Sequence, residues 1–255
     1  MKSVDTVLID ADITAFQVCS VAEVEIEWHE EVWSLYSDFK EVKADFADAV
    51  TGIIELTGAK TAVLAFTDTK NFRKSVYGPY KGNRKGRKPM NYKRLKDWAS
   101  ETWETYVWPN LEGDDVLGVL ATSNPHVGIY SADKDMKTLP ATHWDGEERF
   151  WRPYSLLEAD WWFMYQTLTG DSTDGYPGCP GIGPKRAADI LGPVAHRPIT
   201  DLWPDVVQAF ESKGLTEEDA IQQARCARIL RHEDYNQANG DIRLWNPPHR
   251  KTETE

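Results

Sequence analysis

The stretch VDTVLIDAD, residues 4–12, decides the fold because it ends an apolar run on carboxylates. Val4–Ile9 is short, apolar and β-branched, which is typical of a strand buried inside a sheet. Two later runs of the same character, Thr61–Phe66 and Val127–Ser131, are also followed closely by aspartates. The sequence therefore predicts several buried strands that each deliver acids at the carboxyl end.

Helices are expected between these strands. Apolar residues recur at helical spacing from Phe46 to Thr57, and Gly58 follows as a stop. A short strand is expected at Tyr106–Trp108 and a helix at Glu112–Ala121. Strands that alternate with helices predict an α/β fold with a mostly parallel central sheet flanked by helices. Ligands of such sheets bind beyond the carboxyl ends of the strands.

Acidic residues at these strand ends and at nearby turns form a candidate metal site. The set consists of Asp10, Asp68, Glu112, Asp114, Asp115, Asp133, Asp135, Asp171 and Asp174. Like charges ~4 Å apart repel by about 4 kcal/mol at an intermediate dielectric, so bringing the carboxylates together calls for bound cations. Mg²⁺ suits carboxylate oxygens and water. Two such ions about 4 Å apart can activate water and stabilise the leaving oxygen of a phosphodiester.

Each acid also has a simpler interpretation. A single Asp at a strand end is more often a helix N-cap or a turn former than a metal ligand. Asp12 is interpreted in this way, as a cap or an orienting neighbour. Glu112, Asp114 and Asp115 alone could complement the dipole at a helix start. The metal interpretation depends on acidic clusters recurring at comparable positions of several elements.

The charge of the chain is segregated. A net charge of −12 argues against nucleic acid as a partner of the whole surface. The segment Thr69–Lys96, however, has eleven Lys or Arg residues and no Asp or Glu. Within it, Tyr80, Lys81, Arg84 and Lys85 combine cations and a ring beside glycines, which suits an arch over a nucleic-acid strand. The alternative is a solvated loop.

The second half is expected to be helical, with a glycine-rich turn. Gly181-Ile-Gly183 precedes a predicted helix at Pro184–Leu191, with Lys185 in its first turn. Glycines allow the backbone to approach a phosphate, and a helix start offers free N–H groups. The alternative is a tight structural turn. Further helices are expected at Asp160–Leu168, and from the capping box that opens at Thr216 through Leu230.

Cysteines and hydropathy bear on the compartment. Cys19, Cys179 and Cys226 are odd in number and far apart, so neither a disulfide framework nor a zinc site is indicated. No apolar run approaches membrane-spanning length, and no secretory signal is visible. A cytoplasmic protein without a membrane partner is expected, in the host cytoplasm if the chain is viral.

These motifs together resemble the 5′-nuclease (flap endonuclease) superfamily, and most closely the 5′→3′ exonucleases of T-odd bacteriophages. The matching stretches are LID at 8–10, AFTD at 65–68, YKGNR at 80–84, LEGDDV at 111–116, SADKD at 131–135, GDSTDG at 170–175 and the Gly-Ile-Gly turn. The resemblance covers nearly the whole chain. One departure is Gly175, where many members have Asn.

The resemblance implies a PIN-like α/β fold with a helical arch and a C-terminal helix–three-turn–helix that grips duplex backbone. The expected organisation is a catalytic core at residues 1–165, with the basic arch at about 69–97. A helical DNA-binding region would follow at residues 166–255. No oligomer is implied.

The resemblance also implies roles for the candidate residues. One metal group would be drawn from Asp10, Asp68, Glu112, Asp114 and Asp115, and a second from Asp133, Asp135, Asp171 and Asp174. Two Mg²⁺ ions are expected, with Mn²⁺ as a substitute. Lys81 and Arg84 match arch residues that contact the scissile phosphate, and Tyr80 matches a ring that can face a base. The Gly181–Lys185 turn can also hold K⁺.

The implied activity is Mg²⁺-dependent hydrolysis of phosphodiesters in DNA with 5′ ends, nicks or flaps, in phage replication or recombination. RNA in RNA–DNA hybrids is a further expected substrate. The balance between exonuclease and flap-endonuclease action stays open. A non-catalytic binding module would require lost metal ligands, and none is lost. A small RNase of the wider PIN group would lack Asp171, Asp174 and the glycine turn.

Overall fold

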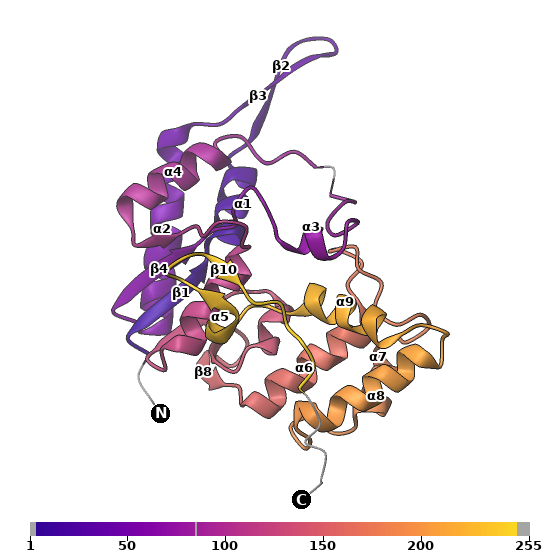
Figure 1. Cartoon of the computed structure of the whole chain (residues 1–255). Coiled ribbons are helices and arrows are strands. Elements are labelled where there is room, and N and C mark those ends of the chain that lie inside the picture. Colours follow the sequence, from indigo (N-terminus) through magenta and orange to yellow (C-terminus); the bar gives the residue numbers. More distant parts are fainter. Residues whose placement is uncertain (1–3, 85, 249–255) are drawn as a thin grey trace, which may run out of the picture. The chain divides into compact units, whose positions relative to one another are not determined.

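A computed structural model describes residues 4–84 and 86–248 of the chain (Figure 1). These residues divide into two compact units. Residues 4–69, 86–132 and 142–152 form the first, here called the α/β unit. Residues 70–84, 133–141 and 153–248 form the second, here called the helical unit. No helix in the described ranges is both long and apolar enough to cross a membrane.

The α/β unit is built on a mostly parallel sheet. Within the described residues its six strands have the order β5-β4-β1-β6-β7-β8. Their bounds are β1 Thr6–Asp10, β4 Thr61–Ala65, β5 Thr105–Tyr106, β6 Val127–Tyr130, β7 Thr142–Asp145 and β8 Phe150–Pro153. The central strand β1 pairs in parallel with β4 and β6, so that Ile9 lies opposite Leu64 and Tyr130. The predicted fold class is confirmed, and so are the three buried strands, to within two residues at each end. The strand predicted at Tyr106–Trp108 lies instead at Thr105–Tyr106.

Helices cover both faces of this sheet. They are α1 Ala11–Val21, α2 Phe39–Thr57, α4 Tyr92–Thr102 and α5 Gly113–Ser123. Val7, Ile9 and Leu64 share a buried core with α1, α2 and α4 on one face. Leu8 and Val63, at the alternate positions, line a cavity with side chains of α5. The two-residue alternation of a strand thus supplies both faces with apolar side chains.

Local chemistry sets the ends of the longest helix, α2. The Asp38 carboxylate accepts a 2.7 Å hydrogen bond from the Lys40 N–H, and so caps the start. Gly58 follows Thr57 with φ of 68°, a left-handed conformation that glycine adopts without strain. The predicted stop at Gly58 is confirmed.

The helical unit packs around its own apolar core. Its elements are α3 Arg73–Val76, η1 Lys134–Thr138, α6 Leu156–Thr169, α7 Pro184–Leu191, α8 Ile199–Glu211, α9 Glu217–Ala227, η2 His232–Asp234, β9 Tyr235–Asn236 and β10 Asp241–Ile242. The predicted helix at Pro184–Leu191 is confirmed at both ends. The capping box at Thr216 is also confirmed, but α9 ends at Ala227 because Arg228 is extended.

The division between the units differs from the boundary predicted at residues 165/166. Tyr77 and Tyr80, inside the predicted arch, pack against the core of the helical unit. The buried Arg73 guanidinium donates to the carbonyls of Cys226, at 3.1 Å, and Arg228, at 2.5 Å. The basic segment is therefore shared: α3 belongs to the helical unit and α4 to the α/β unit.

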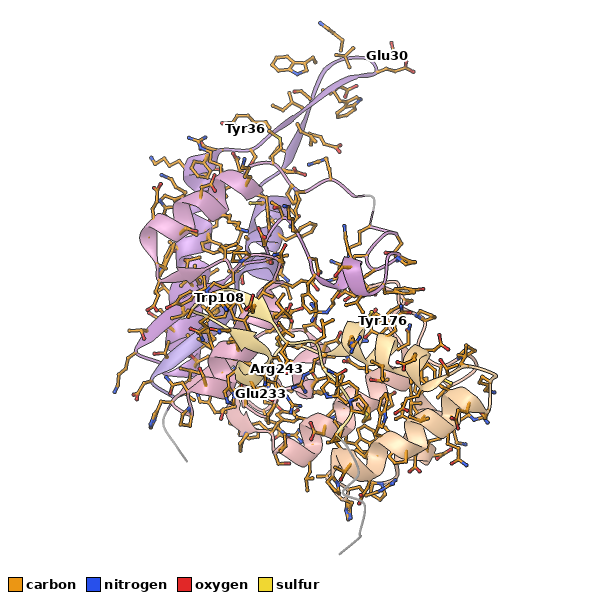
Figure 2. All side chains as sticks on the ribbon, in the orientation of Figure 1. Glu30, Tyr36, Trp108, Tyr176, Glu233 and Arg243 are labelled. Atoms are coloured by element: carbon orange, nitrogen blue, oxygen red, sulfur yellow. The ribbon has the colours of Figure 1, made fainter. Side chains whose placement is uncertain are left out.

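A hairpin of β2 Val24–His29 and β3 Val32–Tyr36 inserts between α1 and α2. Figure 1 shows it projecting from the α/β unit, and Figure 2 shows Glu30 and Tyr36 on it. Trp28 and Trp33 are exposed along its strands. This hairpin was not predicted, although Val24, Ile26 and Trp28 alternate with Glu25 and Glu27, a period-two pattern typical of a strand with one apolar face.

Gly128 in β6 provides a test of the sheet packing. A Cβ added there would lie 2.4 Å from the Trp151 ring, which is held by a 3.0 Å hydrogen bond to the Thr57 carbonyl. We expect Gly128→Ala to lower the free energy of unfolding by about 1–3 kcal/mol through overpacking. Urea unfolding followed by circular dichroism measures the change.

The matched control is Gly52→Ala in α2, where an added Cβ meets nothing within 4 Å. It should leave stability unchanged or raise it by up to about 1 kcal/mol, because alanine favours a helix. Equal stability of the two variants would contradict the packing described for Gly128.

Candidate active site

The α/β unit brings acidic residues of three elements to the carboxyl edge of its sheet. These residues are Asp10, Asp68, Glu112, Asp114 and Asp115, here called the first cluster. Asp10 ends β1, and Asp68 follows β4, which is the parallel neighbour of β1. The Asp68 N–H donates to the Leu111 carbonyl at 2.9 Å, which ties the start of α5 to the end of β4.

Three of the five carboxylates in the first cluster are buried, and Asp68 and Asp114 are half-buried. Asp10, Glu112 and Asp115 are each at most 6% exposed. The Asp10 Oδ2 accepts from the Ser131 hydroxyl at 3.0 Å. The Asp115 Oδ2 accepts from the Glu112 N–H at 3.1 Å as part of a capping box. Glu112 and Asp115 thus form a capping box at the start of α5, as a role at a helix start would allow. Both residues are buried there.

Asp12 braces the end of β4. Its Oδ2 accepts from the Thr67 N–H at 2.7 Å, and its Oδ1 accepts from the Tyr92 hydroxyl of α4. Burial and the neighbouring Asp12 charge raise the pKa of Tyr92, so its hydroxyl remains a donor. These contacts agree with the orienting role expected for Asp12.

The helical unit holds a second cluster of Asp133, Asp135, Asp171 and Asp174. Asp133 and Asp135 open η1, where the Asp133 Oδ1 accepts from the Asp135 N–H at 2.8 Å. Asp171 and Asp174 lie in the turn after α6. The Asp171 Oδ1 accepts from the N–H groups of Thr173, at 2.7 Å, and Asp174, at 3.1 Å.

These four carboxylates lie within electrostatic reach of one another. Burial first, and then the charges of Asp133, Asp171 and Asp174, raise the pKa of Asp135 to about 7 against the opposing effect of Lys134. Burial acts in the same direction on Asp171, but backbone N–H donors and Lys134 outweigh it and lower the pKa. The second cluster is thus a crowded set of hard oxygen donors.

Predicted DNA-contacting residues meet this cluster at Asp174. The Tyr80 hydroxyl donates to the Asp174 Oδ2 at 2.8 Å, and the Arg84 guanidinium bonds its Oδ1 at 2.7 Å. The Lys81 ammonium lies 3.4 Å from the Asp174 Oδ2. Lys85, also predicted to contact DNA, lies outside the described residues.

The departure at Gly175 has a backbone explanation. Gly175 has φ of 76°, and a Cβ there would lie 3.4 Å from the Pro79 carbonyl oxygen. Asn is among the few other residues that adopt this left-handed conformation routinely. Glycine at this position therefore preserves the turn that brings Asp174 to Tyr80 and Lys81.

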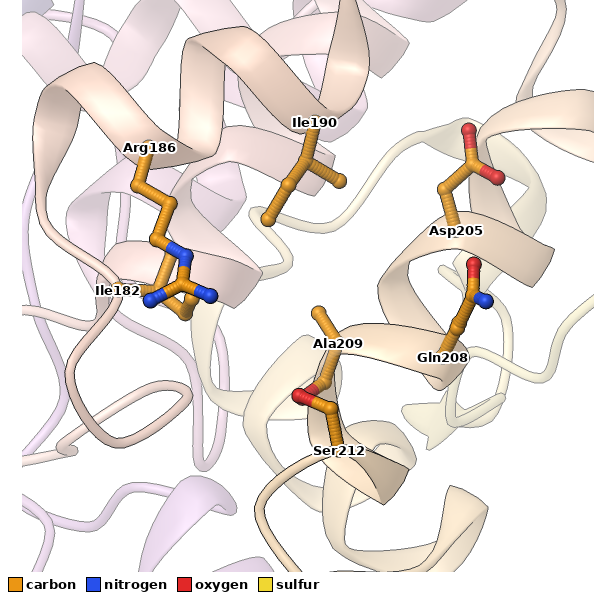
Figure 3. Close-up of a pocket in the computed structure, with 7 residues that line it drawn as sticks. All are labelled: Ile182, Arg186, Ile190, Asp205, Gln208, Ala209 and Ser212. Atoms are coloured by element: carbon orange, nitrogen blue, oxygen red, sulfur yellow. The ribbon is translucent and has the colours of Figure 1, made fainter.

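The glycine turn leads into α7. Gly181 has φ of 74°, and Gly183 is the N-cap residue, followed by Pro184 at the first helical position. A groove of about 410 Å³ lies nearby, between α7 and α8 (Figure 3). Ile190 projects toward it from α7 and Asp205 stands on the α8 side. The predicted Gly181, Gly183 and Lys185 are not among the described residues that line it.

The carboxylates of both clusters are engaged by protein donors. Asp171 pairs with the Lys134 ammonium at 3.3 Å, and Asp174 pairs with Arg84. In the described part of the chain, no three Asp, Glu, His or Cys side chains converge closely enough to hold a metal ion. The assignment of the two clusters as metal ligands therefore stays a prediction.

Two residues at the site escaped the sequence analysis. Lys134 stands between two predicted ligands and pairs with Asp171. Gln166 of α6 is buried and donates to the Asp135 Oδ1. Its only sequence signal is a polar residue within the aromatic and apolar run WWFMYQTLT.

Comparison with known proteins places the chain in a family. No family model matches it. It is 33% identical to the exodeoxyribonuclease of Enterobacteria phage T3, over 94% of this chain and 92% of the relative. It is 34% identical to the exonuclease of Escherichia phage T7, over 94% and 93%. The flap endonuclease Xni of Shewanella woodyi is 30% identical over 64% of this chain and 70% of the relative.

Solved structures agree on the fold. The flap endonuclease of bacteriophage T5, in a complex with DNA and metal ions, has a TM-score of 0.58 at 18% identity, covering 86% of this chain and 87% of that one. A zinc-bound T5 5′-exonuclease has a TM-score of 0.58 at 16% identity, covering 87% and 88%. These similarities confirm an α/β fold with a mostly parallel sheet.

These sequence relatives define the class of the protein, an exodeoxyribonuclease or flap endonuclease. The chain belongs to the 5′-nuclease (flap endonuclease) family, with the T3 and T7 phage exonucleases among its near full-length relatives. The resemblance seen in the sequence motifs is confirmed.

Tyr92 provides a test of the brace at Asp12. Tyr92→Phe removes a donor from a partly buried carboxylate. We expect the free energy of unfolding to fall by about 1–3 kcal/mol in urea unfolding. Tyr106→Phe is the control, because its hydroxyl meets only the exposed end of Glu104, at 2.8 Å, and a loss below about 0.5 kcal/mol is expected. Equal losses would rule out the brace.

Proposed function

We propose that this chain is a Mg²⁺-dependent 5′→3′ exonuclease and structure-specific flap endonuclease of DNA. Its substrates would be DNA with 5′ ends, nicks or flaps, and RNA in RNA–DNA hybrids. The observation that carries the proposal is the near full-length similarity to two phage exonucleases. A role in phage DNA replication or recombination, in the host cytoplasm, follows from the same similarity.

The donor chemistry of both clusters fits divalent cations. All nine predicted acidic ligands are present, and Mg²⁺ and Mn²⁺ prefer carboxylate oxygens and water. The pKa of Asp135 is raised by burial first and by the neighbouring carboxylates second, and a bound cation would stabilise its charged form against both. Bound ions would replace the side chains of Lys134, Lys81 and Arg84 as partners of the carboxylates. Two ions are proposed, one for each cluster.

When bound, such ions supply Lewis acidity and a water of lowered pKa for attack on phosphorus. The chain's own residues would position the substrate. The cationic side chains of Lys81 and Arg84 pair with Asp174 of the second cluster. On substrate binding they would leave Asp174 and pair with a DNA phosphate. Their charge would then stabilise the negative charge that develops during cleavage.

Duplex binding is proposed for the start of α7. Gly181 and Gly183 leave the backbone accessible to a phosphate, and Lys185 adds a cation. The Lys213 ammonium lies 3.9 Å from the position of a Cβ on Gly181, so a second cation is close to the turn. Carbonyl oxygens of the same turn are the proposed K⁺ ligands. Tyr80 and Lys85 would contact the strand that is cut.

End-labelled DNA tests the activity. Duplex and 5′-flapped DNA, labelled at the 5′ or the 3′ end, are incubated with Mg²⁺ or with EDTA and resolved on a denaturing gel. We expect cleavage that begins at 5′ ends and stops in EDTA, because the proposed ligands act only through a bound cation. Cleavage that persists in EDTA, or that begins at 3′ ends, would refute the proposal.

Asp133→Asn tests the second cluster. Replacing one carboxylate oxygen by an amide nitrogen removes a charge and a ligand, so we expect kcat in Mg²⁺ to fall by at least about 100-fold. The matched control, Asp48→Asn, changes an exposed aspartate on α2 and should cleave like the wild type. Wild-type cleavage by Asp133→Asn would show that the ligand assignment is wrong.

A further inference from the structure

We propose that Gln166 is a positioning residue for the second cluster, holding the Asp135 carboxylate in the orientation that binds a divalent cation. This inference rests on the proposed function. Gln166 lies on α6, and its side-chain Nε2 donates to the Asp135 Oδ1. Gln166 is 8% exposed, and its contact with Asp135 is partly buried.

The backbone around Asp135 is already fixed by other contacts. The Asp135 N–H donates to Asp133 at 2.8 Å, and the Asp135 carbonyl accepts from the Thr138 hydroxyl at 2.8 Å. What these contacts leave undetermined is the rotation of the carboxylate about its side-chain bonds. The hydrogen bond from Gln166 to the Asp135 Oδ1 constrains that rotation.

The amide of Gln166 makes no competing structural contact. Its Oε1 is one of two buried side-chain polar atoms in the described residues that have no hydrogen-bond partner. Gln223, a second buried glutamine of the same unit, differs in this respect. Its Oε1 accepts from the Gly178 N–H at 2.9 Å and so secures a turn. The polar end of Gln166 is therefore committed to Asp135.

A neutral donor suits this task better than a cation. Lys134 also approaches Asp135, at 4.0 Å, but its side chain is 73% exposed and it bonds Asp171 more closely, at 3.3 Å. An ammonium beside the carboxylate would compete with a metal ion for its charge. An amide orients the oxygen and leaves the full charge for the ion, as outer partners of metal ligands commonly do.

The test compares Gln166→Met with Gln223→Met. Methionine keeps the length of the side chain and removes the donor. Binding of Mn²⁺ to the DNA-free protein is followed by the loss of the free-ion signal in electron paramagnetic resonance. We expect Gln166→Met to bind Mn²⁺ at one site 10- to 100-fold more weakly. Its thermal midpoint should stay within about 4 °C of the wild type.

Gln223→Met should show the reverse pattern, with unchanged Mn²⁺ affinity and a lower thermal midpoint. Wild-type Mn²⁺ affinity in a folded Gln166→Met variant would overturn the positioning role. Absence of Mn²⁺ binding by the wild type would instead overturn the proposed function, so the two failures are distinguishable.

A second measurement does not depend on the variant folding. In the wild-type protein labelled with ¹⁵N, titration with Mg²⁺ should shift the side-chain NH₂ signals of Gln166, because Asp135 is their acceptor. The NH₂ signals of Gln223 serve as the internal reference and should stay in place. Unmoved Gln166 signals at Mg²⁺ concentrations that support cleavage would overturn the proposal.

Discussion

Repulsion between carboxylates is the constraint on which both clusters depend. A parallel sheet delivers Asp10 and Asp68 to one edge, and a tight turn after α6 holds Asp171 beside Asp174. Such crowding persists only where donors surround the oxygens. The chain supplies them from hydroxyls, backbone N–H groups and lysine or arginine side chains. The fold therefore holds carboxylates close together, and the surrounding donors offset the repulsion between them.

Elements with a strong local pattern could be predicted from the sequence. The strands β1, β4 and β6 were predicted because they are apolar runs. Helix α7 was predicted because Pro184 stands at its start, and Gly192 follows its end. Helix α1 was not predicted, because its apolar residues are spread around the helix rather than gathered on one face. The division between units was missed for another reason. It depends on contacts such as that of Arg73 with Cys226, which are 153 residues apart.

The residues of the candidate site also divide into those that could be predicted from the sequence and those that could not. Aspartates at strand ends and in a glycine-rich turn are recognisable from residue type and position alone. Their supporting residues are not, because a glutamine or a tyrosine in a helix has no distinctive pattern. Gln166 lies 31 residues from Asp135, and Tyr92 lies 80 residues from Asp12. Only the folded chain brings each of them to its carboxylate.

The interleaving of the two units along the chain has a consequence for synthesis on the ribosome. Arg73 is made early, while the carbonyls that accept from its guanidinium, on Cys226 and Arg228, emerge near the end. At the usual rates of translation, the 153 residues from Arg73 to Cys226 take roughly 8 to 30 s. During that interval the basic segment is exposed without its core. The nascent chain thus carries a concentrated cationic segment before the residues that pack against part of it have been made.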